Sequence, residues 1–374
     1  MSSSSLSGPS LSAPGKRVTR IVVQLLGFAI GIGLLAWCAS VAFHEKNREQ
    51  LSRLTDARWQ DVSLLVCLSL ASLVVNGSSF WIVIRPVRRL SWLSVQAVNA
   101  LATALASLPF KLSIVCRFAV HNRRDGVPLL TITTWMASVL VVMLATLGPI
   151  VLAGMWRGTT DAMWWGTSAG GVVLSVVLVV ALARLFSREV IWSSVGRWLG
   201  EKKYAQFAPG MTADDPHAQT RGQETSGRWQ GSIRRRAVKA GLAARAREGF
   251  QMLSSPTAVG GGALLRCVDL GIQAGRFLVA ANIVQQDITV DQAVLAASAY
   301  FLVGVLSPAG SLGFREAAVF GLLKGEAFSI VVLTVTAAET LVVLACATAG
   351  GLWLKLGQRQ KRGDAGGSAS PSLR

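Results

Sequence analysis

Long apolar runs, most of them longer than twenty residues, limit most strongly how this chain can fold. A helix rises about 1.5 Å per residue, so roughly 20 apolar residues cross the hydrocarbon layer of a bilayer. Backbone polar groups in lipid must be paired within their own segment, which favours helices. Runs of suitable length are Ile21–Phe43, Val62–Ile84, Val127–Ala153, Met163–Phe186, Thr257–Val284 and Ala327–Leu354. We therefore expect an all-α polytopic membrane protein with about six transmembrane helices.

Two further apolar segments are interrupted, Trp92–Val120 by Pro109 and Gln292–Leu323 by Pro308. Each could cross the membrane, which would give about eight apolar helices, or enter and return as a re-entrant hairpin. The loop over residues 187–250 carries 12 Lys or Arg against 6 Asp or Glu. Positive residues concentrate on the cytoplasmic side, and this loop is cytoplasmic only if Trp92–Val120 is re-entrant. We therefore predict two re-entrant hairpins and cytoplasmic N- and C-termini.

This topology divides the chain into two membrane halves, over residues 16–186 and 251–356. A basic cytoplasmic loop over residues 187–250, partly disordered, connects them. The Ser-, Pro- and Gly-rich residues 1–15 and the basic tail over residues 357–374 are also predicted to be disordered, because they hold too few apolar residues to form a core.

The two interrupted segments have similar sequences. Each holds an Ala-Val pair, then a proline, then an arginine: Ala97, Val98, Pro109 and Arg117 in the first, and Ala293, Val294, Pro308 and Arg315 in the second. The predicted hairpins open to opposite sides of the membrane. Matching interrupted segments in opposite orientation are typical of inverted-repeat transporters, and the sequence is consistent with such a repeat.

Composition excludes several classes of function. The net charge is +18, but 52% of the residues are hydrophobic and no nucleic-acid recognition motif accompanies the charge. The cysteines all lie in apolar segments without C-x-x-C spacing, at Cys38, Cys67, Cys116, Cys267 and Cys346. The three histidines, His44, His121 and His217, share no helix turn. We therefore expect no nucleic-acid partner, no metal site and no cofactor. The sequence also has no Walker A motif for ATP.

The segment Leu306–Ala318 holds features that membrane helices avoid, and it is the first candidate for a site. Gly310 and Gly313 allow backbone angles that other residues disfavour. Arg315 and Glu316 follow, and a charge at membrane depth costs about 2.5–3.5 kcal/mol on insertion scales unless it meets a partner or water. A half-helix that starts near Gly313 would point free N–H groups into the membrane, and Arg315 would add donors suited to a phosphate.

The other candidate residues are charged side chains in apolar segments, namely Lys111, Arg117, Arg266, Asp269, Arg276 and Glu339. Lys111 and Arg117 could contribute to the same anion site from the first interrupted segment. Arg266 and Asp269 are three residues apart, so they share a helix face and can pair. Glu316 and Glu339 could neutralise the arginines of an empty site or carry protons. The alternative for these charges is a purely structural role as ion pairs between helices or as anchors of the second hairpin.

Two motifs carry a resemblance to a known family. The first is S-P-A-G-S-L-G-F-R-E-A at Ser307–Ala317, and the second combines Pro109, Lys111 and Arg117 with N-R-R-D-G at Asn122–Gly126. The chain resembles, over roughly Ile21–Leu354, the flippase-type transmembrane domain of bacterial lysylphosphatidylglycerol synthases, which also occurs as stand-alone integral membrane proteins.

The chain departs from the family pattern at three positions. Ser113 and Ile114 replace the expected Gly-Glu of one motif, and Ser311 replaces a Gly of the other. The resemblance implies translocation of lipid between leaflets, or handling of envelope lipid, in the bacterial inner membrane. It does not imply aminoacyl transfer, which belongs to a separate soluble domain.

We therefore expect a flippase-like protein that translocates or handles an anionic phospholipid or a lipid-linked headgroup, and we expect no enzymatic activity. One alternative is a non-transporting scaffold or accessory subunit for envelope lipid or glycolipid synthesis, with a soluble partner bound to the loop over residues 187–250. Another is a membrane transferase or hydrolase. Gly166–Gly170 matches G-x-S-x-G, but that motif functions at a strand-to-helix elbow, and this match lies in an apolar helix.

Overall fold

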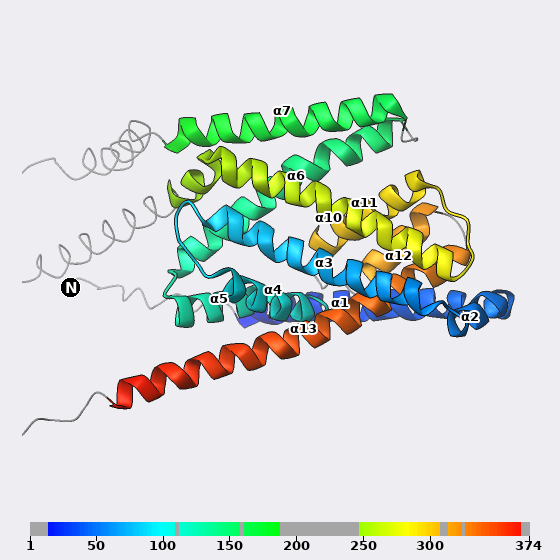
Figure 1. Cartoon of the computed structure of the whole chain (residues 1–374), viewed down its shortest axis with the longest axis horizontal. Coiled ribbons are helices and arrows are strands. Elements are labelled where there is room, and N and C mark those ends of the chain that lie inside the picture. The colour runs from blue at the N-terminus through cyan, green and yellow to red at the C-terminus, as the bar shows by residue number, and fades with distance from the viewer. Residues whose placement is uncertain are drawn as a thin grey trace, which may run out of the picture. The chain divides into compact units, whose positions relative to one another are not determined.

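The computed structural model describes residues 14–108, 112–157, 161–187, 247–306, 313–323 and 326–367. These ranges are helical and contain no strand (Figure 1). The helices are α1 Pro14–Ala42, the 3₁₀ helix η1 Glu45–Asn47, α2 Arg48–Thr55, α3 Trp59–Ile84, α4 Trp92–Ala106, α5 Leu112–Asp125, α6 Leu129–Arg157, α7 Ala162–Ser187, α10 Pro256–Ile283, α11 Val290–Leu306, α12 Phe314–Leu323 and α13 Glu326–Gly367. Residues 247–254 are also helical. The expected all-α polytopic membrane protein is confirmed.

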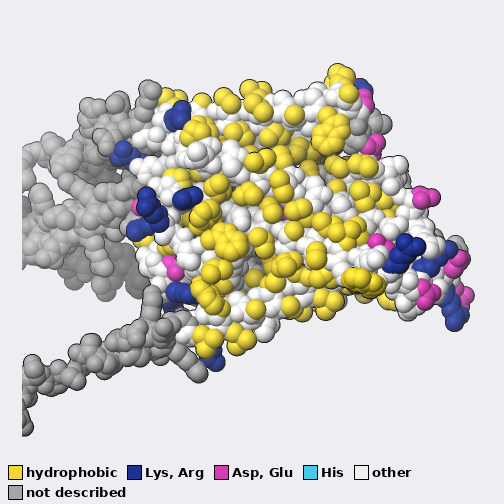
Figure 2. All heavy atoms as spheres, viewed as in Figure 1, with side chains coloured by type: hydrophobic (Ala, Val, Ile, Leu, Met, Phe, Trp, Pro, Cys, Tyr) yellow, Lys and Arg dark blue, Asp and Glu magenta, His cyan; other side chains and the backbone are white. Residues whose placement is uncertain are grey.

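Five of the described helices are long and apolar enough to cross a membrane. They contain the spans Val22–Ala42, Trp59–Ile84, Leu129–Arg157, Ala162–Ser187 and Phe328–Leu356. Large apolar side chains on these helices are exposed, as expected where lipid is the solvent. Figure 2 shows hydrophobic side chains over most of the surface in view, with few charged side chains among them.

The sixth predicted crossing corresponds to α10, which is 28 residues long and therefore also long enough. It differs from the five spans because it contains Arg266, Asp269 and Arg276, and all three side chains are buried. α10 therefore combines the length of a membrane helix with charges that face protein rather than lipid.

The interrupted segments each form two short helices. α4 and α5 have 15 and 14 residues, and α11 and α12 have 17 and 10, which correspond to lengths of about 15 to 26 Å. Each helix is thus shorter than the roughly 30 Å hydrocarbon layer. α11 and α12 contact each other, so the chain turns back between them as a hairpin would. The intervening residues 109–111 and 307–312 lie outside the described part of the chain.

The chain forms two compact units that are interleaved in sequence. The first unit contains Met1–Leu73, Ala97–Arg117 and Leu270–Arg374, and the second contains Val74–Gln96 and Phe118–Asp269. In the first unit α1 packs on α12 and α13 (Figure 1), so the first helix lies with the last ones. The two membrane halves over residues 16–186 and 251–356 stay a prediction.

Close backbone contact holds α1 against the start of α12 in the first unit. Gly313 has a φ of +83°, and a Cβ atom added to it would lie 1.7 Å from the carbonyl oxygen of Gly31. Trp37 and Phe320 pack edge to face nearby, with ring centroids 4.9 Å apart. Glycine is therefore required at position 313 for both its backbone angle and its size.

In the second unit, α7 packs on α6 (Figure 1). Pro149 lies inside α6, and a Cβ atom added to Gly171 of α7 would lie 2.7 Å from the Cβ of Pro149. The hydroxyl of Thr131 donates to Glu248, which attaches the helical residues 247–254 to α6. The second unit is thus held by small-residue packing and by polar contacts near helix ends.

Two helices are longer than the sequence predicted. α1 begins at Pro14, seven residues before the predicted apolar run starts at Ile21, and proline is well suited to the first helical position. α13 continues to Gly367, past the predicted end of the crossing at Leu354. Its extension is rich in Lys, Arg and Gln, which are good helix formers, so the helix continues beyond the apolar span.

Candidate functional site

The site is built around the start of α12, where Glu316 binds the backbone of its own helix. Glu316 Oε2 accepts the N–H of Gly313 at 2.7 Å, and its Oε1 accepts the Thr336 hydroxyl at 3.0 Å. The first N–H groups of a helix have no partner within the helix, and a glutamate at the third position commonly satisfies one of them. Glu316 is fully buried. Its carboxylate therefore closes the broken end of α12 and connects it to α13.

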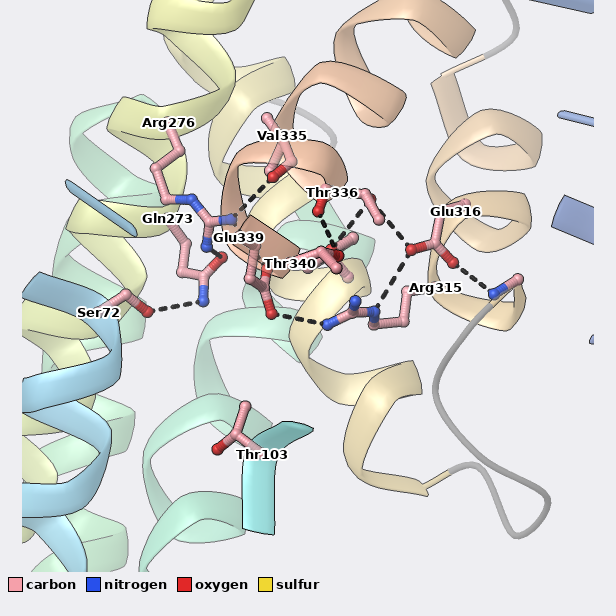
Figure 3. Close-up of polar contacts among 12 residues, drawn as sticks. Ser72, Thr103, Gln273, Arg276, Arg315, Glu316, Val335, Thr336, Glu339 and Thr340 are labelled. Atoms are coloured by element: carbon pink, nitrogen blue, oxygen red, sulfur yellow. Dashed lines mark hydrogen bonds and ion pairs between the residues drawn. The ribbon is translucent and has the colours of Figure 1, made fainter. Parts of the chain in front are cut away.

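Arg315 extends from the same helix start toward Glu339 of α13 (Figure 3). Its Nη1 donates to Glu339 Oε1 at 2.9 Å, and its Nε lies 3.5 Å from Glu316 Oε1. The guanidinium carbon lies 4.3 Å from the centroid of the Tyr300 ring, within cation–π range. The Arg315 side chain retains 12% exposure.

Glu339 joins two arginines from different helices. Its Oε1 binds Arg315 (Figure 3). Its Oε2 accepts Arg276 Nη2 from α10 at 2.8 Å and the Tyr300 hydroxyl from α11 at 3.2 Å. Glu339 itself lies on α13 and is 17% exposed at the side chain. One carboxylate therefore bridges two guanidinium groups.

Arg276 is the most deeply buried member of this group, at 1% exposure. Its Nη1 donates to Gln273 Oε1 at 3.0 Å, and its Nη2 also lies 3.2 Å from the Val335 carbonyl oxygen. Gln273 in turn donates to the Ser72 hydroxyl on α3 at 3.1 Å. These contacts from α3, α10 and α13 hold the guanidinium in place.

We refer to Arg276, Tyr300, Arg315, Glu316 and Glu339 as the arginine–glutamate cluster. Its two arginines and two glutamates carry no net charge. Buried ions are costly to remove from water, and taking away one partner of a buried pair typically costs about 3–5 kcal/mol. Neutrality therefore makes the cluster tolerable in a membrane protein. It also places two forked hydrogen-bond donors around one partly exposed carboxylate.

Three other residues predicted for the site make contacts of their own. In the second unit, Arg266 Nη1 lies 3.2 Å from Asp269 Oδ2, the pairing that their spacing allows, and Arg266 Nη2 donates to Asn76 at 2.7 Å. In the first unit, Arg117 donates to Asn99 Oδ1 at 2.7 Å, and Asn99 donates to the Leu73 carbonyl at 3.1 Å. Arg117 therefore belongs to a hydrogen-bonded group of α3, α4 and α5.

Some predictions concern residues that the structure does not describe. Lys111 and Gly310 lie outside the described ranges, as does most of the loop over residues 187–250, where the scaffold hypothesis expects a soluble partner. The G-x-S-x-G match at Gly166–Gly170 lies within α7, where Ser168 is buried. Within the ranges that are described, no group of three or more His, Cys, Asp or Glu could hold a metal ion.

Sequence reasoning missed the neutral members of the site, Gln273, Tyr300 and Thr336. A signal for two of them exists. Gln273 precedes Arg276 by three residues, and Thr336 precedes Glu339 by three, so each polar residue shares a helix face with a charge. Tyr300 is one of two tyrosines in the chain and lies in an otherwise apolar segment, but nothing in its spacing indicates the partners it contacts.

Comparison with known families gives one match. The model of the lysylphosphatidylglycerol synthase TM region matches residues 24–348, most of the chain. The protein belongs to this family. The expected resemblance is thus confirmed, and the family description connects this membrane protein with lipid handling. No curated protein and no solved structure matched the chain.

Proposed function

We propose that this protein translocates, or otherwise handles between the two leaflets, an anionic phospholipid or a lipid-linked headgroup, and that it catalyses no reaction itself. The observation that carries the proposal is the bridging of Arg276 and Arg315 by Glu339, beside the capped end of α12. Guanidinium groups match the geometry of phosphate oxygens through paired N–H donors. The membership in a lipid-associated membrane family supports a lipid as the source of that phosphate.

The position of the cluster supports a route between leaflets. Charged side chains inside membrane helices usually face a partner or a water-filled path rather than lipid. Broken helices at that depth commonly form the substrate sites of transporters, because their ends leave backbone donors and acceptors available. The α11–α12 pair combines both features, and Arg315 and Glu339 keep part of their surface exposed.

Translocation can be measured in proteoliposomes with a fluorescent phosphatidylglycerol and a membrane-impermeant quencher. We expect vesicles that contain the protein to lose fluorescence from the inner leaflet faster than empty vesicles. Arg315→Ala and Arg276→Ala should abolish this gain, because each removes a phosphate donor. Thr340→Val is the matched control, since the Thr340 hydroxyl donates to the Thr336 carbonyl of the same helix. Equal rates with and without the protein would refute the proposed function.

We also propose that the protein resides in the bacterial inner membrane with both termini in the cytoplasm. Single cysteines at Asn122 and Asp287, which are exposed, can be labelled from either side in a cysteine-free background. The re-entrant arrangement predicts cytoplasmic labelling at position 122 and external labelling at position 287. External labelling at position 122 would mean that α4 and α5 cross the membrane instead.

A further inference from the structure

The two glutamates of the arginine–glutamate cluster are held in different ways. Glu316 accepts a backbone N–H and a threonine hydroxyl, and it is fully buried. Glu339 accepts its hydrogen bonds from Arg276, Arg315 and Tyr300, and it is partly exposed. Release of Glu316 would uncap α12, whereas release of Glu339 would free two guanidinium groups and break no backbone contact.

Glu339 is bound as an anionic ligand would be. Each of its two carboxylate oxygens receives an N–H from a different arginine, at 2.9 Å from Arg315 and 2.8 Å from Arg276. Two unesterified oxygens of a phosphate group can make the same bridge. Arg276 is in addition held by Gln273 and the Val335 carbonyl, so its guanidinium would stay in place without Glu339.

Arg276 also retains unused donor capacity. Its Nε is buried and makes no hydrogen bond with the residues that the structure describes, whereas the buried Arg315 Nε lies 3.5 Å from Glu316 Oε1 in an ion pair. Buried donors without a hydrogen bond are rare in proteins. The two unesterified oxygens of a phosphodiester share one negative charge, as the two oxygens of the Glu339 carboxylate do. A phosphodiester can therefore replace Glu339 between the two arginines without a change in the charge of the cluster.

We propose that Glu339 is a displaceable internal counter-ion, which occupies the position of a phosphate-type oxyanion between Arg276 and Arg315 until a ligand replaces it. Glu316 is the fixed carboxylate that keeps α12 in shape during the exchange. This inference rests on the proposed function for the identity of the ligand as a lipid, but the exchange itself is a property of the cluster. It makes Glu339 a competitor for the site rather than a contact to the ligand.

Binding can be measured by calorimetry on the full-length protein in detergent, with dihexanoyl phosphatidylglycerol as the probe. Because Glu339→Gln removes the competing charge and leaves both arginines, we expect it to bind the probe about tenfold more tightly than the natural protein. Glu339→Asp, whose shorter side chain reaches the two arginines less well, should give a smaller gain. Thr340→Val should give none, and dihexanoylglycerol, which lacks the phosphate, should show no dependence on position 339.

Thermal unfolding of each variant shows whether it is folded. If Glu339→Gln does not fold, the affinity of Glu339→Asp is compared with that of the natural protein instead. Unchanged or weaker binding by the folded variant would overturn the inference, as would an equal gain in Thr340→Val. If inorganic phosphate binds as tightly as the lipid with the same dependence on position 339, the counter-ion exchange stands and the ligand is free phosphate. If binding tightens as expected but proteoliposomes show no translocation, the exchange stands and the proposed transport function fails.

Discussion

Replacement of Gly313 by alanine tests how closely the start of α12 packs on α1. Two separate effects lower the free energy of unfolding at this position. A non-glycine residue with φ near +83° sits in the left-handed region, which costs about 1–2 kcal/mol. The new Cβ would also lie 1.7 Å from the Gly31 oxygen and 2.6 Å from its carbonyl carbon, which are backbone atoms that cannot rotate away. Forced overpacking of this kind costs about 1–3 kcal/mol.

The expected loss in the free energy of unfolding is therefore about 2–5 kcal/mol. It can be measured by titration of the detergent-solubilised protein with SDS, followed by tryptophan fluorescence. Gly321→Ala is the matched control in the same helix, since Gly321 is exposed and an added Cβ meets no atom within 4 Å. Alanine is the better helix former, so this control should be neutral or gain about 0.5–1 kcal/mol.

Asparagine at position 313 separates the two costs, because it tolerates positive φ better than alanine but carries the same Cβ atom. A loss in Gly313→Asn comparable to that in Gly313→Ala would assign the effect to the contact with Gly31. If instead both variants unfold within about 0.5 kcal/mol of the natural protein, the contact between α1 and α12 cannot be as close as described.

Two further predictions concern charges outside the cluster. Asp269→Asn should lower the free energy of SDS unfolding by about 3–5 kcal/mol, because it leaves the buried Arg266 guanidinium without its carboxylate. Replacement of Arg266 and Asp269 together by Met and Leu should recover much of that loss. An equal loss in Asp269→Asn and in the double variant would contradict this. The Arg157 guanidinium holds the pKa of Asp161 below its usual value of about 3.9, so this contact stabilises the folded state above about pH 4 and is lost as the pH falls through the lowered pKa. The difference in melting temperature between the natural protein and Asp161→Asn should accordingly be present at pH 7 and shrink below about pH 4, and a difference that is constant with pH would refute it.

The membrane helices could be predicted from the sequence because they depend on the length and composition of single segments. The predicted crossing at Val62–Ile84 corresponds to α3 at Trp59–Ile84, and Met163–Phe186 corresponds to α7 at Ala162–Ser187. The ends differ by a few residues because polar and aromatic residues at a helix terminus continue the helix beyond the apolar run. α10 was predicted from its length in spite of its three charges.

The site could be predicted in part. The helix break near Arg315 and Glu316 and the pair of Arg266 and Asp269 can be predicted, since each depends on residues close together in the chain. The bridge that Glu339 forms between Arg276 and Arg315 cannot be predicted, because it depends on how α10, α12 and α13 pack. Residues that meet across helices have no characteristic spacing, so a charge in an apolar helix indicates that a partner exists without indicating which one.

The packing of α1 on α12 and α13 has a consequence for how the protein is made. About 270 residues separate the end of α1 from the start of α12. At a synthesis rate of about 5–20 residues per second, α1 waits in the bilayer for roughly 15 to 55 seconds before its partners leave the ribosome. During that interval the surface of α1 around Gly31, which later contacts Gly313, is open to other helices. A ribosome stalled before α12, or a stop codon there, would leave a chain that is inserted in the membrane but cannot complete its first unit, and quality-control proteases would encounter α1 as an unpaired helix.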